Sequence, residues 1–222
     1  MNLSFLFAKR YLLGKKSTNA INIISGLAVL GLAIGTAAMI LLLSVFNGFE
    51  LMISNMSSSF NPDIKITAKK GKLFRCDSAF LHKVQNINGV FAVAQTIEET
   101  SFFEYKGAQD FGILKGVDDN YKTVTDFNNI IQEGNFNIGS NQQYFAVLGA
   151  GMRNKLAVGL EDQVAAISVF MPKKEDDGPL QQPYKKRFIN PVGIFSAQQE
   201  IDFQYIITNI ALVRELMDVT NM

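Results

Sequence analysis

Cysteine and histidine are almost absent from this sequence, which contains one residue of each, Cys76 and His82, and no tryptophan. A single cysteine cannot form a disulfide within the chain, so the stability of the fold has to come from packing. One histidine beside one cysteine, without a cluster of other ligands, makes up neither a metal site nor a nucleophile and base pair. The sequence therefore predicts no metal, no cofactor and no catalytic residue.

Charge is missing from one long stretch, Ala20 to Phe46. An apolar helix of about 20 residues crosses the hydrocarbon core of a bilayer, where its backbone groups pair within the helix. We therefore predict a transmembrane helix over residues 20–47. A cleaved signal peptide is the alternative, but its apolar region would be about 7 to 15 residues long and would end at a small-residue cleavage site, which this stretch lacks.

Acidic residues are absent before Glu50, whereas basic residues precede the apolar stretch, namely Lys9, Arg10, Lys15 and Lys16. The positive-inside rule then puts the N-terminus in the cytoplasm. Residues 1–16 mix apolar and basic side chains, which predicts a short amphipathic helix at the membrane interface. Residues 48–222 are mildly acidic overall, so we expect an extracytoplasmic domain that is no nucleic-acid binder.

Small residues gather on one side of the predicted span. Gly31 and Gly35 form a G-x-x-x-G step, and Ala38 extends the same face. Small side chains let a second helix approach closely, so this face is predicted to pack against another transmembrane helix. The alternative is that these residues only reflect the usual composition of transmembrane helices.

An α+β pattern follows the span. Ile64 to Thr67 alternates between apolar and polar residues, as strands do, and Asp77 or Ser78 is placed to cap a helix. Val90 to Tyr105 and Phe111 to Val117 have the pattern of two further strands. This β-α-β-β order predicts a small α+β lobe.

The second half of the domain is predicted to be rich in strands. Asp118 to Ser140 is rich in Asn and Gly and predicts loops with short turns. Gly149 to Gly151 predicts a tight bend before a short helix over Met152 to Leu156. A last helix is expected from Ile210 onward. The predicted strands are Tyr144–Leu148, Val164–Phe170, Phe188–Phe195 and Tyr205–Thr208.

The most polar run of the domain, PKKEDDGPLQQPYKKR, lies between two of these strands. Its prolines cannot donate to a strand ladder, so they are expected to end the flanking strands and to stiffen the loop. The middle of the run is acidic, and lysines and an arginine stand on both sides. The pattern predicts an exposed hairpin loop.

Four segments resemble a known family in their order and spacing: AKRYLL, SVFNGFE, VLGAGMRNKLAV and NPVGIFSAQQEIDFQYIIT. Together they resemble the first half of an ABC-transporter permease of the LolC/LolE lipoprotein-releasing type, within the MacB/FtsX superfamily. Glu161-Asp162 stands where the family usually has Gly-Asp. The family also has three further spans, so we expect these 222 residues to be part of a longer subunit.

The resemblance implies an α+β fold with one N-terminal transmembrane helix followed by a two-lobed periplasmic domain over residues 48–222. A porter-like α+β lobe would take residues 61–117 and 202–222. An inserted β-rich, sabre-like lobe would take residues 118–201. The protein would lie in the inner, cytoplasmic membrane, with its N-terminus in the cytoplasm and its main domain in the periplasm.

In this family a hairpin loop hooks the periplasmic lipoprotein carrier, and the polar run lies where that loop belongs. The alternative is a solvated hairpin tip without a partner. The hook residues implied by the resemblance are Pro172, Lys173, Lys174, Glu175, Asp176, Asp177, Gly178, Pro179, Leu180, Gln181, Gln182, Pro183, Tyr184, Lys185, Lys186 and Arg187.

The function that the resemblance implies is extraction of lipoproteins from the inner membrane by a subunit that is itself no enzyme. Its partners would be a separate cytoplasmic ABC ATPase, a second permease subunit of the same or a homologous kind, a periplasmic lipoprotein carrier, the lipoprotein substrates and membrane lipid. Two alternatives stay open. One is a MacB/FtsX-like mechanotransmission or efflux permease, and the other is a single-span receptor whose ectodomain binds a ligand.

Overall fold

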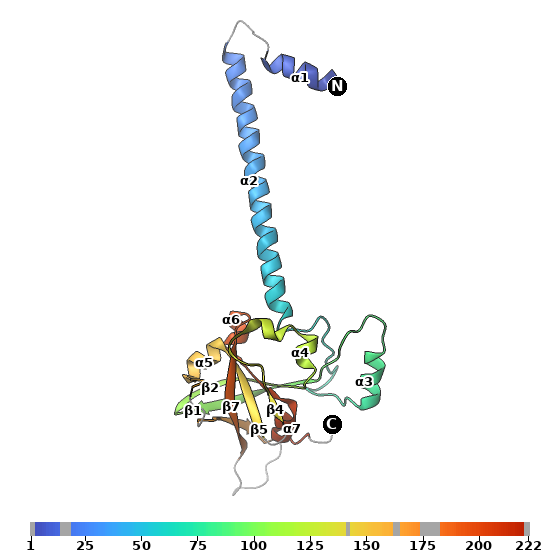
Figure 1. The fold of residues 1–222 in the computed structure, drawn as a ribbon, viewed down its shortest axis with the longest axis vertical. Helices are drawn as coiled ribbons and strands as arrows, with labels where there is room; N and C mark the ends of the chain where they lie inside the picture. The colour runs from blue at the N-terminus through green and yellow to red at the C-terminus, as the bar shows by residue number, and fades with distance from the viewer. Residues whose placement is uncertain (1–2, 14–18, 141–142, 162–164, 174–182, 220–222) are drawn as a thin grey trace. The chain divides into compact units, whose positions relative to one another are not determined.

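The computed structural model describes residues 3–13, 19–140, 143–161, 165–173 and 183–219. The chain divides into two compact units, Met1–Ile53 and Ser54–Met222, which are taken separately below (Figure 1).

The first unit is helical. Helix α1 (Leu3–Leu13) lies where the basic N-terminal helix is predicted, and α2 (Asn19–Ser58) continues beyond the predicted end of the span. Within α2, residues Ile23–Ile53 have a mean hydropathy of 2.5 and are long and apolar enough to cross a membrane. Thr36 satisfies its hydroxyl inside this apolar stretch by donating to the carbonyl of Leu32 at 2.9 Å.

The second unit is built on a mixed eight-stranded sheet with the order β3-β7-β6-β1-β2-β8-β5-β4 among the described residues. Its strands are β1 (Thr96–Tyr105), β2 (Ala108–Val117), β3 (Ile131–Gly134), β4 (Gly139–Ser140), β5 (Gln143–Gly149), β6 (Ile167–Pro172), β7 (Tyr184–Phe195) and β8 (Tyr205–Asn209). The helices are α3 (Ser78–Gln85), α4 (Tyr121–Val124), the 3-10 turn η1 (Phe127–Ile130), α5 (Ala150–Leu156), α6 (Gln199–Asp202) and α7 (Ile210–Leu216).

Strand β7 closes the sheet on itself. Its first half pairs with β6, its second half pairs with both β3 and β5, and the β5 pairing completes a ring through β6, β1, β2 and β8. Strands from both predicted lobes therefore share one sheet. The division into a porter-like and a sabre-like lobe stays a prediction.

Side-chain alternation along the strands creates two cores. Leu148 of β5 and Ile206 of β8 belong to one core, together with α5 and α7, whereas their neighbours Val147 and Ile207 belong to the other. The second core also contains Phe60, α4 and η1. Because the faces alternate residue by residue, each of these strands contributes to both cores.

Three expectations about local structure are wrong. The segment from Ile64 to Thr67 forms no strand, and Ile64 is 80% exposed, because no described strand pairs with it. The strands β3 and β4 also lie between Asp118 and Ser140, where the composition predicts loops with short turns. The alternating pattern of Val90–Tyr105 becomes a strand only from Thr96.

The glycines at the junction of β5 and α5 are required by close packing. Gly149 is the N-cap of α5, and Gly151 lies inside the helix. A Cβ on Gly149 would lie 2.3 Å from the carbonyl oxygen of Asp202, and one on Gly151 would lie 2.4 Å from the ring of Phe203. The segment around α6 therefore approaches the start of α5 too closely for any other residue.

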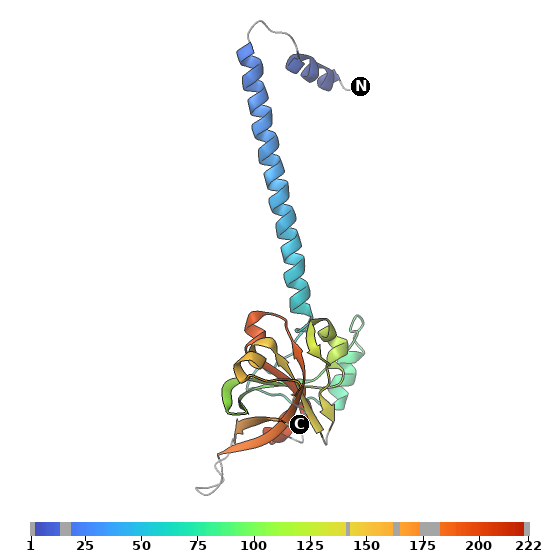
Figure 2. The same ribbon diagram turned by 60° about the vertical axis from the view of Figure 1, so that its left-hand side comes forward.

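Helix α3 begins as predicted. Asp77 is its N-cap, and the carboxylate accepts a hydrogen bond from the backbone N–H of Phe80 at 2.8 Å. The helix buries none of its described residues and lies outside the sheet in both views (Figures 1 and 2).

A buried lysine lies beside the ring of Phe60, a residue that is separated from the end of α2 only by Ser59. Lys115 of β2 is only 3% exposed, and its ammonium nitrogen lies 4.1 Å from the centroid of the Phe60 ring. Its counter-charge is Glu98, the directly opposite residue on β1, at 3.4 Å. Glu98 also pairs with Lys65 at 3.2 Å. The charge is thus buried and partly compensated.

Burial lowers the pKa of the Lys115 ammonium from 10.5 to about 8, although the Glu98 carboxylate opposes part of this shift. The unfolded chain therefore binds more protons than the folded chain between pH 8 and 10.5. Consequently the free energy of unfolding rises with pH across that window. Below the window Lys115 is charged in both states, and its contribution to the free energy of unfolding is least favourable there.

We predict that Lys115→Met removes this pH dependence. Between about pH 7.5 and 9.5 the free energy of unfolding of the parent should rise by about 2 kcal/mol relative to that of the variant. The reason is that the folded and the unfolded parent bind different numbers of protons in this range. Urea unfolding of the chain in detergent, followed by circular dichroism at several pH values, measures the difference. Parallel pH profiles of the two proteins would contradict the prediction.

Candidate functional site

The polar run forms the end of the β6–β7 hairpin. The strands pair from Ile167 with Ile189 to Pro172 with Tyr184, and the backbone N–H of Lys173 donates to the carbonyl of Pro183 at 3.0 Å. Both strands therefore reach further into the run than predicted, and a proline stands at each side of the hairpin base. Of the predicted hook residues, 174–182 lie outside the described residues.

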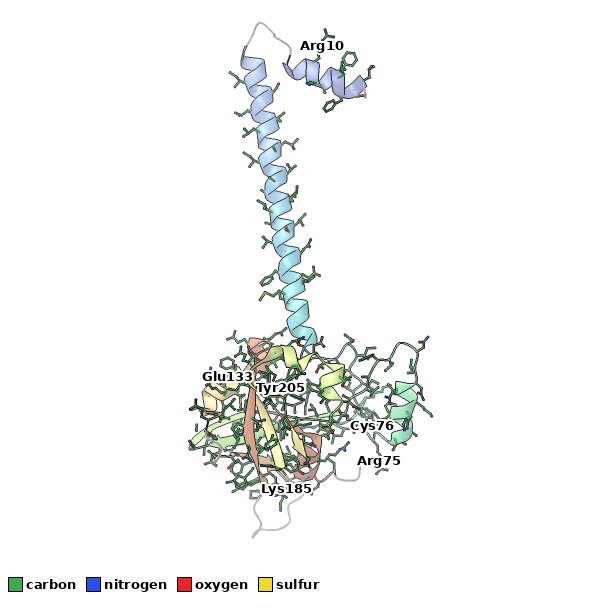
Figure 3. All side chains as sticks on the ribbon, viewed as in Figure 1. Arg10, Arg75, Cys76, Glu133, Lys185 and Tyr205 are labelled. Carbon is green, nitrogen blue, oxygen red and sulfur yellow. The ribbon has the colours of Figure 1, made fainter. Side chains whose placement is uncertain are left out.

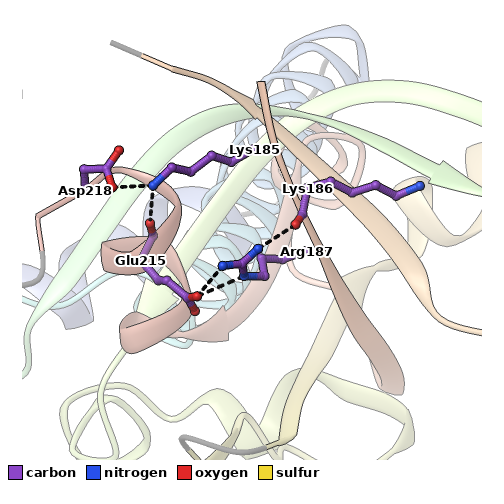
Figure 4. Close-up of polar contacts among 5 residues, drawn as sticks. All are labelled: Lys185, Lys186, Arg187, Glu215 and Asp218. Carbon is purple, nitrogen blue, oxygen red and sulfur yellow. Dashed lines mark hydrogen bonds and ion pairs between the residues drawn. The ribbon is translucent and has the colours of Figure 1, made fainter. Parts of the chain in front are cut away.

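The basic residues at the start of β7 point to two different faces. Lys185 and Arg187 face α7, whereas Lys186, between them, points away (Figure 4). This follows from strand alternation, since successive side chains leave opposite faces of a sheet. The predicted basic cluster is thus divided between the two faces of the hairpin.

Acidic groups at the end of α7 pair with the two residues that face it. The guanidinium of Arg187 donates to the Glu215 carboxylate from Nε at 3.0 Å, and this hydrogen bond raises the pKa of Arg187. The ammonium of Lys185 contacts Asp218 and donates to the backbone carbonyl of Glu215 at 3.1 Å. These two cations tie the hairpin to α7. Residues about 30 positions apart make the pairs, so no local pattern predicts them.

A row of aromatic rings runs across one face of β2, β1, β6 and β7; the rings at its two ends are exposed and those in the middle are half-buried. The aromatic row, as we name it, consists of Phe111, Phe102, Phe170, Tyr184 and Phe188. Ring centroids of Phe102 lie 5.0 Å from Phe111 and 5.7 Å from Phe170, and Phe170 lies 5.4 Å from Tyr184. Phe111 is 66% exposed and Phe188 60%. A contiguous group of apolar side chains that reaches the surface in this way is typical of interaction surfaces.

Lys186 adds a charge to this row. Its ammonium lies 4.8 Å from the ring centroid of Phe170 and 5.1 Å from that of Phe188. The surface therefore offers apolar ring faces around one cation, immediately beside the base of the hairpin loop. It is suited to a partner with an apolar patch and a nearby acidic group.

The other predicted contact face, on α2, is open within this chain. Gly31, Gly35 and Ala38 are exposed, and a Cβ added to either glycine would meet nothing within 4 Å. The face is thus accessible to a second helix, as close packing through small residues requires. Whether it packs stays a prediction.

Among the described residues, no three His, Cys, Asp or Glu side chains gather closely enough to hold a metal. Burial, and to a smaller extent the neighbouring Asp77 carboxylate, raise the pKa of the Cys76 thiol. A thiol with a raised pKa is a weak nucleophile. The hairpin and the aromatic row are therefore the strongest candidate site.

A family model described as the MacB-like periplasmic core domain matches residues 25–170. The chain belongs to this family. The matched range begins inside α2 and ends in β6, so it includes the strands β1, β2 and β5.

Curated relatives agree with this assignment. The lipoprotein-releasing system transmembrane protein LolC of Buchnera aphidicola (subsp. Schizaphis graminum) is 28% identical over 200 residues, covering 90% of this chain and 48% of that protein. The corresponding LolE protein of Haemophilus influenzae is 23% identical over 222 residues, covering 95% and 50%. The resemblance to LolC/LolE-type permeases is confirmed, and the chain spans about half the length of the curated relatives it matches.

Among solved structures, the periplasmic region of MacB from Actinobacillus actinomycetemcomitans is similar. The TM-score is 0.45 at 10% sequence identity, over 73% of this chain and 70% of that one. The predicted fold class, α+β with an N-terminal apolar helix, is confirmed.

We predict that replacing Gly31 and Gly35 together by leucine weakens assembly with a partner helix by at least about tenfold, because the larger side chains prevent close backbone approach. Gly26→Leu is the matched control, since at about 100° per residue it lies on the opposite side of α2. Assembly can be measured by the dilution dependence of energy transfer between labelled subunits in lipid. Equal assembly of all variants would mean that this face contacts only lipid.

Proposed function

We propose that this chain forms part of an ABC-transporter permease subunit that extracts lipoproteins from the inner membrane and passes them to a soluble periplasmic carrier. A separate cytoplasmic ATPase supplies the energy, so the subunit is not an enzyme by itself. Helix α2 anchors the subunit, with the N-terminus in the cytoplasm and residues 54–222 in the periplasm. The small-residue face of α2 packs within the permease or against a second permease subunit.

The observation that carries this proposal is the β6–β7 hairpin, whose exposed base and adjoining aromatic row form a continuous surface. A carrier of acylated proteins needs an apolar cavity, and its rim is a natural partner for exposed rings. Lys186 lies among the rings, where it attracts an acidic group beside such a cavity. Two cations on the other face fasten the hairpin to α7, so the surface is preorganised, which lowers the entropy lost on docking.

Lipoprotein release is also what the names of the curated relatives describe, at 23–28% identity over most of this chain. ATP-driven movement would reach the docking surface through the domain, because the ATPase lies on the other side of the membrane. Such movement is a rotation biased by different contacts in two states.

Replacing residues 174–182 by a short Gly-Ser turn should leave the fold intact and abolish carrier binding, because the paired strands end at Pro172 and Tyr184. The melting temperature and a carrier-binding titration are measured on the same protein. A lost fold would make the loop structural. Undiminished binding would move the carrier contact elsewhere.

We further predict that the aromatic row contributes to carrier affinity. Phe111→Ser and Phe188→Ser should each weaken binding at least about fivefold, since aromatic side chains that become buried in an interface can contribute more than about 1 kcal/mol. Phe91→Ser is the control, because Phe91 is 88% exposed and lies outside the row. Calorimetric titration with the carrier separates the outcomes, and equal affinities of all three variants would exclude the row from the contact.

A further inference from the structure

Strand β7 connects two places that the proposed function requires to move together. Its first residue, Tyr184, is at the base of the hairpin loop, and its last residue, Phe195, stacks on Phe60 with ring centroids 5.7 Å apart. Its 12 residues span about 40 Å at about 3.3 Å per residue. Tyr205, beside Phe60, and Lys185, near the loop, accordingly lie at opposite ends of the domain (Figure 3).

Phe60 is the point at which the chain that follows α2 enters the core. Its ring is 2% exposed and lies 5.1 Å from the ring of Tyr205 and 6.3 Å from that of Phe127. Its backbone carbonyl accepts a hydrogen bond from the phenol of Tyr121 at 2.7 Å. Burial raises the pKa of Tyr121, so the phenol stays protonated and remains a donor. Both the side chain and the backbone of Phe60 are therefore held.

Lys115 completes this enclosure. Its ammonium is 4.1 Å from the centroid of the Phe60 ring and 5.0 Å and 5.9 Å from those of Tyr121 and Tyr205. A desolvated cation over aromatic rings is held more strongly than an exposed one. We name this group of five residues the entry joint: Phe60, Lys115, Tyr121, Phe195 and Tyr205.

We expect the fold to tolerate replacement of Lys115 by an apolar side chain of similar size. Its lowered pKa means that the buried ammonium is held at a cost in free energy. Replacing a buried charge by an apolar side chain of similar volume is often neutral or stabilising. Glu98 would not be left as an isolated buried charge, because it is partly exposed and keeps its pair with Lys65 at 3.2 Å.

We propose that Lys115 is a positioning residue of the entry joint, which holds Phe60 against β7 and β8 so that displacement of the chain at Phe60 moves the β6–β7 hairpin. The effect on lipoprotein transfer rests on the proposed function, whereas the packing of the entry joint can be tested independently of that function. Without the cation, Phe60 loses one of the groups that enclose it, and the movement that reaches β7 becomes smaller.

The first test is hydrogen exchange on the full-length protein in detergent. Lys115→Met should speed exchange about five- to thirty-fold in a peptide covering residues 59–63, the factor that corresponds to about 1–2 kcal/mol. Peptides from β7 should stay unchanged. Tyr121→Phe, which removes the phenol that donates to the Phe60 carbonyl, should also speed exchange in this peptide. This variant tests the joint if Lys115→Met does not fold.

Lys155→Met is the matched control. Lys155 also pairs with a carboxylate, Asp110 at 2.9 Å, and lies 5.9 Å from the ring centroid of Phe203, but it is outside the entry joint. Its variant should leave exchange at residues 59–63 unchanged. Parental exchange rates there in both Lys115→Met and Tyr121→Phe would overturn the proposed joint.

The second test measures coupling in the full-length permease reconstituted with its ATPase in liposomes. A fluorescent triacylated lipopeptide is the probe, and its transfer to the carrier is counted per ATP hydrolysed. Lys115→Met should lower this ratio about fivefold while ATP turnover, carrier affinity and melting temperature are retained. Lys115→Arg, which keeps a cation beside the rings, should restore most of the ratio.

The two proposals fail in different ways. If the parent transfers no lipopeptide and binds no carrier, the proposed function is wrong, and the exchange experiment alone decides whether the joint exists. If the parent transfers lipopeptide and Lys115→Met does so with an equal ratio, the role of Lys115 in coupling is overturned. A parallel loss of melting temperature and transfer would make Lys115 merely structural, which also overturns it.

Discussion

The enclosure of Phe60 is the contact on which the arrangement of the domain depends. The residue follows α2 closely in sequence, yet its ring lies among Phe195, Tyr205 and Lys115, which come from three different strands. Aromatic rings supply large buried area, and the cation adds direction to their packing. The chain therefore enters the domain at a defined point of the sheet.

Strand alternation gives the β6–β7 hairpin two roles at once. Lys185 and Arg187 bind the end of α7 on one face, while Lys186 lies among exposed rings on the other. Exposed ion pairs contribute little stability one by one, but here they orient a strand whose other face is a candidate docking surface. The same alternation separates the two cores, so a shift of one residue in β7 would exchange the two faces.

Much of the local structure can be predicted from residue patterns. The absence of charge from Ala20 to Phe46 predicts an apolar helix, and the position of Asp77 predicts a helix cap, as the structure has them. Both signals are local, because they depend on neighbouring residues of the same segment. The alternation at Ile64–Thr67 is equally local but misleading, since a strand requires a partner and the described residues provide none.

Residue patterns alone are enough to predict the apolar helix, the polar hairpin run and the family resemblance, because each depends on consecutive residues or on their order. The packed domain is needed to see which basic residues of β7 form ion pairs, that a lysine on β2 lies against Phe60, and that aromatic residues from several strands form one row. These contacts join residues far apart in the chain. They depend on strand order and register, which follow from the packing of the whole domain.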